Sequence, residues 1–157
     1  MSIANAWPSI HCALLLAAAL MGAGNTAAQT RWRYSPDGAE VIDNQTGLRW
    51  RRCSEGQMYS AGSCLGNAMT FTHEEALARA KGQTGWRLPN VKELSSIVDT
   101  DRGLPSIDVA VFPETPSYPY WSSSPYERNG QAWNVDFNYG HIRPARRFLR
   151  LQFRLVR

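Results

Sequence analysis

The chain has 157 residues, with 17 Lys and Arg against 13 Asp and Glu and a formal net charge of +4 at pH 7. This length supplies one domain with a single hydrophobic core and is too short for two domains. A basic chain attracts polyanions such as sulfated glycans, nucleic acids or anionic lipid head groups, although net charge does not choose among them.

The first 28 residues carry no charged side chain and contain an apolar run of 13 residues, from Cys12 to Gly24. Such a run is too short to span a bilayer but suits the hydrophobic region of a secretory signal. Small residues at Thr26-Ala27-Ala28 suit cleavage. We therefore expect a signal peptide at residues 1–28 and a mature domain at residues 29–157, periplasmic or extracellular and without an integral membrane span.

The mature chain keeps two cysteines, Cys53 and Cys64. An even number of cysteines in an exported protein favours a disulfide, which would close a glycine-containing loop with little regular structure. Two buried free thiols are the alternative. A zinc site is not expected, because only His73 and His141 remain as nitrogen ligands and their spacing does not match a zinc motif.

Short segments that alternate apolar and polar residues predict strands near residues 31–34, 41–42, 48–51, 120–124, 132–137 and 148–156. In the last segment the leucines and Phe153 are expected to face the core, with Arg150, Gln152 and Arg154 facing solvent. Four tryptophans beside apolar residues are expected in the core: Trp50, Trp86, Trp121 and Trp133. A proline-rich loop is expected over residues 99–119.

Two capping boxes predict two helices, one starting after Thr72 with Glu75 and one starting after Asn90 with Glu93. The first is expected to end at Gly82 in left-handed geometry, with His73 exposed in its first turn. Their inward faces are expected to hold Ala76, Leu77 and Ala80 in the first helix and Val91, Leu94, Ile97 and Val98 in the second. The pattern predicts an α+β fold, with two short helices packed on a small, mainly antiparallel twisted sheet with long loops.

Several motifs of the mature chain occur in the same order in a known family. They are Thr46-Gly47-Leu48-Arg49-Trp50, the Cys53 to Cys64 loop, Gly85-Trp86-Arg87-Leu88-Pro89-Asn90-Val91-Lys92-Glu93-Leu94, Phe112-Pro113, Tyr120-Trp121-Ser122-Ser123-Ser124, Ala132-Trp133-Asn134-Val135-Asp136-Phe137 with Gly140, and Arg154-Leu155-Val156-Arg157. On these motifs the chain resembles the Lcl C-terminal domain family, named for a Legionella collagen-like adhesin.

The resemblance implies an exported bacterial domain whose fold is similar to the C-type lectin-like group. It also implies an adhesin-like or ligand-displaying module. In the named adhesin, the domain is implicated in binding sulfated glycosaminoglycans and in trimer formation. This chain has no collagen-like repeat.

The last fifteen residues hold six arginines and no carboxylate side chain. Arginine binds sulfate, phosphate and carboxylate through paired N–H groups. The candidate ligand-binding residues are therefore Arg143, Arg146, Arg147, Arg150 and Arg154, together with Tyr126, Tyr139 and His141 at neighbouring turns. The alternative is a solvated basic face, or one paired with Asp99, Asp101 and Asp108.

Asn134 and Asp136 resemble part of the Trp-Asn-Asp calcium motif of C-type lectins, but the chain lacks the partner motif that would complete a calcium site. Neither a metal nor a cofactor is therefore expected. Ser122 to Ser124 lack the surrounding glycines of a nucleophile elbow, so no enzyme activity is expected either. The sequence favours a module that binds a sulfated or acidic glycan. The alternative is a structural or assembly module that docks another envelope protein or itself.

Overall fold

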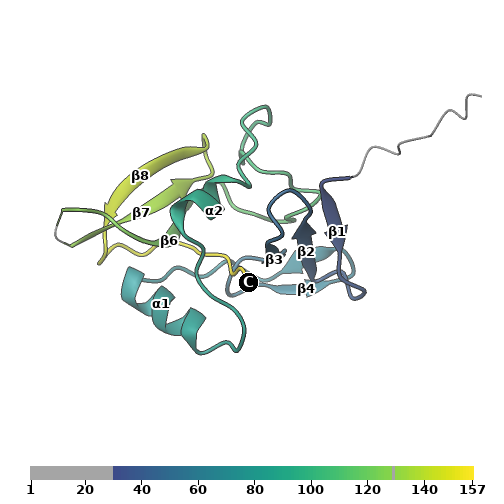
Figure 1. Cartoon of the computed structure of the whole chain (residues 1–157), viewed down its shortest axis with the longest axis horizontal. Helices are drawn as coiled ribbons and strands as arrows, with labels where there is room; N and C mark the ends of the chain where they lie inside the picture. The colour runs from purple at the N-terminus through teal and green to yellow at the C-terminus, as the bar shows by residue number, and fades with distance from the viewer. Residues whose placement is uncertain (1–29, 129) are drawn as a thin grey trace, which may run out of the picture.

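The computed structural model describes residues 30–128 and 130–157, which form a small mixed α/β domain with two helices and three small antiparallel sheets (Figure 1). The signal peptide expected at residues 1–28 lies outside the described residues. The first sheet contains β1 (Trp32–Tyr34), β2 (Glu40–Asp43) and β3 (Arg49–Arg51), and the third contains β6 (Pro119–Pro125), β7 (Gln131–Asp136) and β8 (His141–Arg146).

A two-stranded hairpin occupies the loop that was expected to be irregular. Its strands are β4 (Met58–Ser60) and β5 (Ser63–Leu65), and a disulfide joins Cys53 to Cys64. Cys64 lies opposite Tyr59 in the hairpin, so the disulfide ties this small sheet to the chain that leaves β3. The prediction of the disulfide is confirmed, and the prediction of little regular structure is wrong, because the tight turn at Ala61 and Gly62 allows backbone pairing.

Both helices begin at the predicted caps. In α1 (His73–Lys81) Thr72 and Glu75 form a capping box, and in α2 (Val91–Ser95) Asn90 and Glu93 do the same. Two details differ from the expectations. The Gly82 backbone is right-handed, with φ −70°, and α2 ends at Ser95, so Ile97 and Val98 pack from the turn that follows it.

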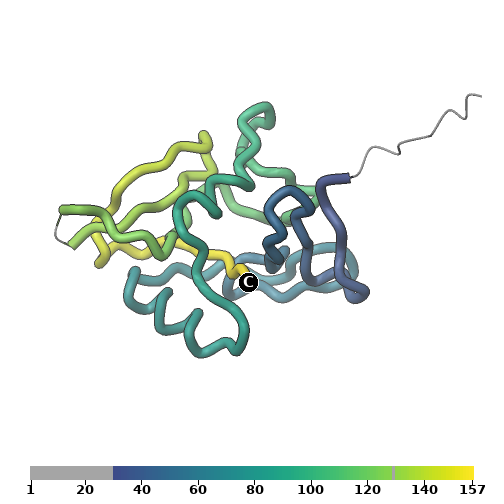
Figure 2. The backbone as a smooth tube through the Cα atoms, in the orientation of Figure 1, coloured from purple at the N-terminus to yellow at the C-terminus, as the bar shows by residue number. Residues whose placement is uncertain are grey.

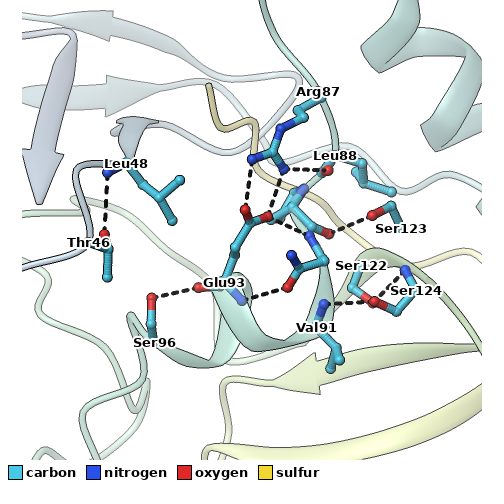
Figure 3. A network of polar contacts seen from close by, with 12 residues as sticks. Thr46, Leu48, Arg87, Leu88, Val91, Glu93, Ser96, Ser122, Ser123 and Ser124 are labelled. Carbon is cyan, nitrogen blue, oxygen red and sulfur yellow. Dashed lines mark hydrogen bonds and ion pairs between the residues drawn. The ribbon is translucent and has the colours of Figure 1, made fainter.

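The start of α2 is held by a network of polar contacts that joins three segments (Figure 3). Arg87 donates to both carboxylate oxygens of Glu93, each at 2.7 Å. These hydrogen bonds, with the Asn90 N–H, hold the pKa of Glu93 below its ordinary value. The N–H of Val91 donates to Oγ of Ser124 at 3.0 Å, which fixes α2 against β6.

Strand β6 separates two groups of buried apolar side chains, because successive residues of a strand point to opposite faces. Tyr120 belongs to the group that includes Trp50, Leu94 and Phe137. Trp121 belongs to the group that includes the α1 residues Ala76 and Ala80. Both faces of the third sheet are therefore partly covered, as the backbone trace in Figure 2 also shows.

The carboxy-terminal segment, residues 151–156, runs through the middle of the domain between these two groups (Figure 1). The expected alternation is present from residue 151 onward, because Leu151, Phe153 and Leu155 share one apolar group. Leu149 was also expected to face the core, but it is 44% exposed because it lies in the turn before this segment. The expected solvent-facing side is absent, because all six residues are buried, including the polar residues Gln152 and Arg154. The segment makes isolated bridges to residues 50, 71, 87 and 120 instead of one continuous strand.

Three further expectations about burial are wrong. Trp50 and Trp121 are fully buried, but Trp86 and Trp133 are only half-buried. His73 is 2% exposed rather than solvated, because its ring packs edge-on against Trp121, with ring centroids 5.2 Å apart. In α1, Leu77 remains 38% exposed although Ala76 and Ala80 are buried.

Candidate functional site

Strand β8 is the outer strand of the third sheet, and most of its side chains are exposed. It pairs with β7 along its whole length, from His141 opposite Asp136 to Arg146 opposite Gln131. We call a set of residues on and beside this strand the basic edge. It contains the exposed Tyr139, His141, Arg143 and Arg146 and the half-buried Arg147. All five were candidates from the sequence, and the fold places them along one strand and its two flanking turns.

At one end of the basic edge, Tyr139, His141 and Arg143 form a contiguous set. The rings of Tyr139 and His141 lie 5.9 Å apart at an interplanar angle of 37°. Arg143 donates to Nδ1 of His141 at 2.9 Å. Tyr139 is 62% exposed, and the other two side chains are exposed as well. This end offers an aromatic face and a guanidinium group to one ligand.

At the other end of the basic edge, Arg146 and Arg147 make different contacts. The guanidinium of Arg146 lies 5.9 Å from the ring centroid of Phe148, which is 65% exposed. Arg147 is half-buried, and its Nε donates to the carbonyl of Gln131 at 3.1 Å. One guanidinium carries five donors, and the other four of Arg147 make no hydrogen bond to the described residues.

Tyr126 does not belong to the basic edge. It packs edge-on against Trp133, with ring centroids 4.8 Å apart and an interplanar angle of 83°. Trp133 lies opposite Pro144 of β8, so this aromatic pair sits beside the edge strand. The sequence did not suggest Trp133 as a surface residue, because its alternation with Val135 and Phe137 matches a core-facing pattern.

Two predicted site residues are not available to a ligand in the expected way. Arg150 forms an ion pair with Glu75 at 2.9 Å and also donates to the carbonyl of Thr70. Arg154 is fully buried, and its guanidinium donates to the carbonyls of Arg51 and Arg52 and to the hydroxyl of Thr115. The prediction that Arg154 belongs to an outward basic face is therefore wrong.

Burial changes the acid–base equilibria of Arg154 and of the neighbouring Tyr120. Burial lowers the pKa of Arg154 to about 10, and burial also raises the pKa of Tyr120 beside it. The side chain stays protonated at neutral pH, and its charge is held by carbonyl and hydroxyl dipoles. No carboxylate among the described residues pairs with it.

The two side chains that resemble part of a calcium motif, Asn134 and Asp136, already make hydrogen bonds within the fold. The amide of Asn134 donates to the carbonyl of Arg143 at 2.8 Å, and the residue is buried. The carboxylate of Asp136 accepts from the backbone and side chain of Asn138. Within residues 30–128 and 130–157 no group of three His, Cys, Asp or Glu side chains could hold a metal ion.

In the part of the chain that the structure describes, no helix combines the length and apolar character needed to cross a bilayer. Neither a curated protein nor a solved structure matches this chain. A family model does match, the Lcl C-terminal domain, over residues 39–157. This match covers both core groups and the basic edge, and the chain therefore belongs to the Lcl C-terminal domain family.

Proposed function

We propose that the protein is an exported module that binds an anionic, sulfated or acidic glycan through the basic edge. The observation that carries the proposal is that the arginines of the basic edge form no ion pair with a carboxylate among the described residues. Among the described residues, Arg143, Arg146 and Arg147 have no carboxylate partner, whereas eight other arginines each pair with a carboxylate. Unpaired guanidinium groups on and beside one edge strand suit a linear polyanion.

Exposed rings beside these arginines support a sugar chain over a small inorganic anion. Tyr139 and Phe148 flank the arginines at the two ends of β8, with exposed fractions of 62% and 65%. An aromatic face complements the apolar C–H surface of a pyranose ring, while the guanidinium groups take its sulfate or carboxylate groups. A strand of six residues spans roughly 20 Å, which is long enough to contact several sugar units.

Heparin chromatography across a salt gradient tests this proposal. The wild-type protein should be retained at low salt, and retention should fall steeply as salt rises, because binding releases counterions from the polyanion. Replacing Arg143, Arg146 and Arg147 together by Ala should abolish most of the retention. It should also reduce the slope of log K against log salt by roughly 1 for each lost contact.

A matched control removes the same charge elsewhere. Arg33, Lys81 and Lys92 are exposed, and no ion pair involves them among the described residues. Replacing these three by Ala should weaken retention only slightly, through the change in net charge. Equal retention by the two triple variants would remove the basic edge from the proposal.

Three broader expectations belong to the same proposal. The fold is taken to be of the C-type lectin-like group, which the family membership and the small antiparallel sheets with a disulfide-tied hairpin support. The disulfide also supports export, since such bonds persist in oxidising compartments. The domain is taken to act by binding rather than by catalysis. The mass of the protein recovered from the periplasm or medium tests removal of residues 1–28.

The alternative is an assembly module whose edge strand docks another copy or an envelope protein. Strand β8 ends its sheet, and Ile142 is 47% exposed, so this surface is accessible to a partner. Pro144 lacks a backbone donor and the neighbouring arginines are charged, features that discourage edge-to-edge pairing. Light scattering at several concentrations tests this, and a constant monomer mass would count against self-assembly.

A further inference from the structure

A cavity of about 350 Å³ lies between the first sheet, the β4–β5 hairpin and the half-buried ring of Trp86. We call it the indole pocket. In Figure 1 it belongs to the end of the domain that carries β2, β3 and β4, whereas β8 lies at the opposite end. Its volume is at the lower end of the range for small-molecule sites.

The charged group that this pocket offers is the guanidinium of Arg51. It lies over the ring of Trp86, 4.9 Å from the ring centroid, and Arg157 lies over the same ring at 4.6 Å. The only carboxylate contact of Arg51 within the described residues is a long one, 3.9 Å to Glu55. Glu55 is engaged more closely by Arg79, at 2.8 Å. The donors of Arg51 are therefore largely unused.

The other polar groups of the pocket are already bonded within the protein. The hydroxyl of Ser54 lies 2.6 Å from that of Tyr120, and Gln57 bonds backbone atoms on both sides. Glu40 holds Arg49 and Arg157. The remaining lining is largely apolar: Met58, Tyr59, Trp86 and Leu155. A ligand thus meets one available cation and an apolar wall.

The surroundings of the pocket are also positive. Arg52 donates to the hydroxyl of Tyr59, and Arg154 donates to that of Ser54, and both arginines are buried without a carboxylate partner among the described residues. Two buried cations behind the lining favour an anion in front of it, because charges are screened less in a protein interior than in water.

We propose that the indole pocket binds a small carboxylate carried on an apolar body. This chemistry is shared by an aromatic carboxylic acid and by the C-terminal carboxylate of a peptide that ends in an apolar residue. The carboxylate accepts two N–H groups of Arg51, and the apolar body contacts Trp86 and Met58. The site does not depend on the basic edge and uses none of its residues.

NMR titration of the oxidised protein tests the proposal, with the indole N–H signal of Trp86 as the reporter, identified by its loss in Trp86→Phe. The probes are phenylacetate and acetyl-Ala-Phe with a free C-terminus. At least one of them should shift the signal saturably, and the one that does identifies the source of the carboxylate. Phenylacetamide lacks the charge and acetate lacks the apolar body, so each should bind at least about tenfold more weakly.

Two variants of the same charge test the role of Arg51. Arg51→Gln should weaken binding by at least about tenfold, whereas Arg33→Gln should stay within about twofold, because Arg33 is exposed and does not line the pocket. A Trp86 signal that neither probe shifts would overturn the proposal. Equal binding of phenylacetamide, or unchanged binding in Arg51→Gln, would do the same. Heparin retention reports on the basic edge alone, so the two proposals can fail separately.

Discussion

The basic edge and the carboxy-terminal segment follow each other along the chain, yet their arginines have opposite environments. Arg143 is exposed on an outer strand, and within residues 30–128 and 130–157 its guanidinium bonds only the side chain of His141. Arg154 is fully buried and makes four hydrogen bonds to two carbonyls and two hydroxyls. The comparison teaches that the position of an arginine in an alternating segment does not predict its exposure to solvent when both faces of that segment are covered.

The largest effect expected from this difference is on stability. Arg154→Met keeps most of the volume but leaves two buried carbonyls and the hydroxyl of Thr115 without their donor, which should cost roughly 3–4 kcal/mol. Arg143→Met removes an exposed side chain and should change the free energy of unfolding by less than about 0.5 kcal/mol. Urea denaturation compares the two variants. Similar losses in both would show that the two environments are energetically alike.

Removing the disulfide should separate the two regions, because it should lower the stability of the core without changing the basic edge. Replacing Cys53 and Cys64 by Ala frees a hairpin that adjoins the carbonyl of Arg52, one of the acceptors of Arg154. The expected loss is about 2–3 kcal/mol, because the short loop no longer restricts the unfolded chain. Thermal and urea unfolding measure this loss. Heparin retention below the melting temperature should not change, since the basic edge lies on another sheet.

A smaller effect is expected at the start of α2, which packs against the third sheet. Asn90→Ala removes the side chain that accepts from the N–H of Glu93 and should cost about 1 kcal/mol. Asn90→Ser keeps an acceptor and should restore most of that loss. A loss below a few tenths of a kcal/mol in Asn90→Ala would mean that the Arg87–Glu93 pair alone fixes this helix start.

The smallest effect concerns pH and His73, which lies between the two regions. Its backbone N–H donates to the carbonyl of Arg147, and its ring Nε2 lies 3.0 Å from the carbonyl of Ser122. Burial lowers the pKa of His73, so the unfolded chain binds its proton more readily than the folded one. Stability should therefore fall as pH drops below the ordinary histidine pKa, by at most about 0.7 kcal/mol between pH 7 and pH 6.

His73→Phe should remove this pH dependence, because the substituted ring keeps the edge contact with Trp121 but does not titrate. His141→Phe is the matched change on the basic edge, where the side chain is exposed, and it should leave the dependence as in the wild type. Unfolding free energies measured at pH 7 and pH 6 decide between these outcomes. The same dependence in all three proteins would assign it to other groups.

Local signals in the sequence predicted much of the fold. Both capping boxes, the strands near residues 41–42, 48–51, 120–124 and 132–137 and the disulfide are confirmed. Each of these features depends on neighbouring residues or on a cysteine count. The family is confirmed as well, since its ordered motifs span the matched residues. Glycan binding, assembly and location stay predictions.

Other features could not be predicted from the sequence, because they depend on contacts between distant segments. Trp133 has the alternation of a core residue, but it belongs to neither group of buried side chains, and its half-buried ring packs against Tyr126 instead. Arg51 and Trp86 are 35 positions apart, and they reach one pocket because Val156 bridges both Trp50 and Arg87. No local sequence pattern predicts a contact between two residues so far apart in the chain.

The sequence by itself determined where helices begin, which cysteines pair and that the end of the chain is rich in arginine, because capping, thiol pairing and charge are local or compositional properties. Only the tertiary structure decided which arginines meet solvent. An arginine is buried or exposed according to what packs over it, and for Arg154 the covering residues, Arg52, Thr115 and Phe112, come from distant parts of the chain.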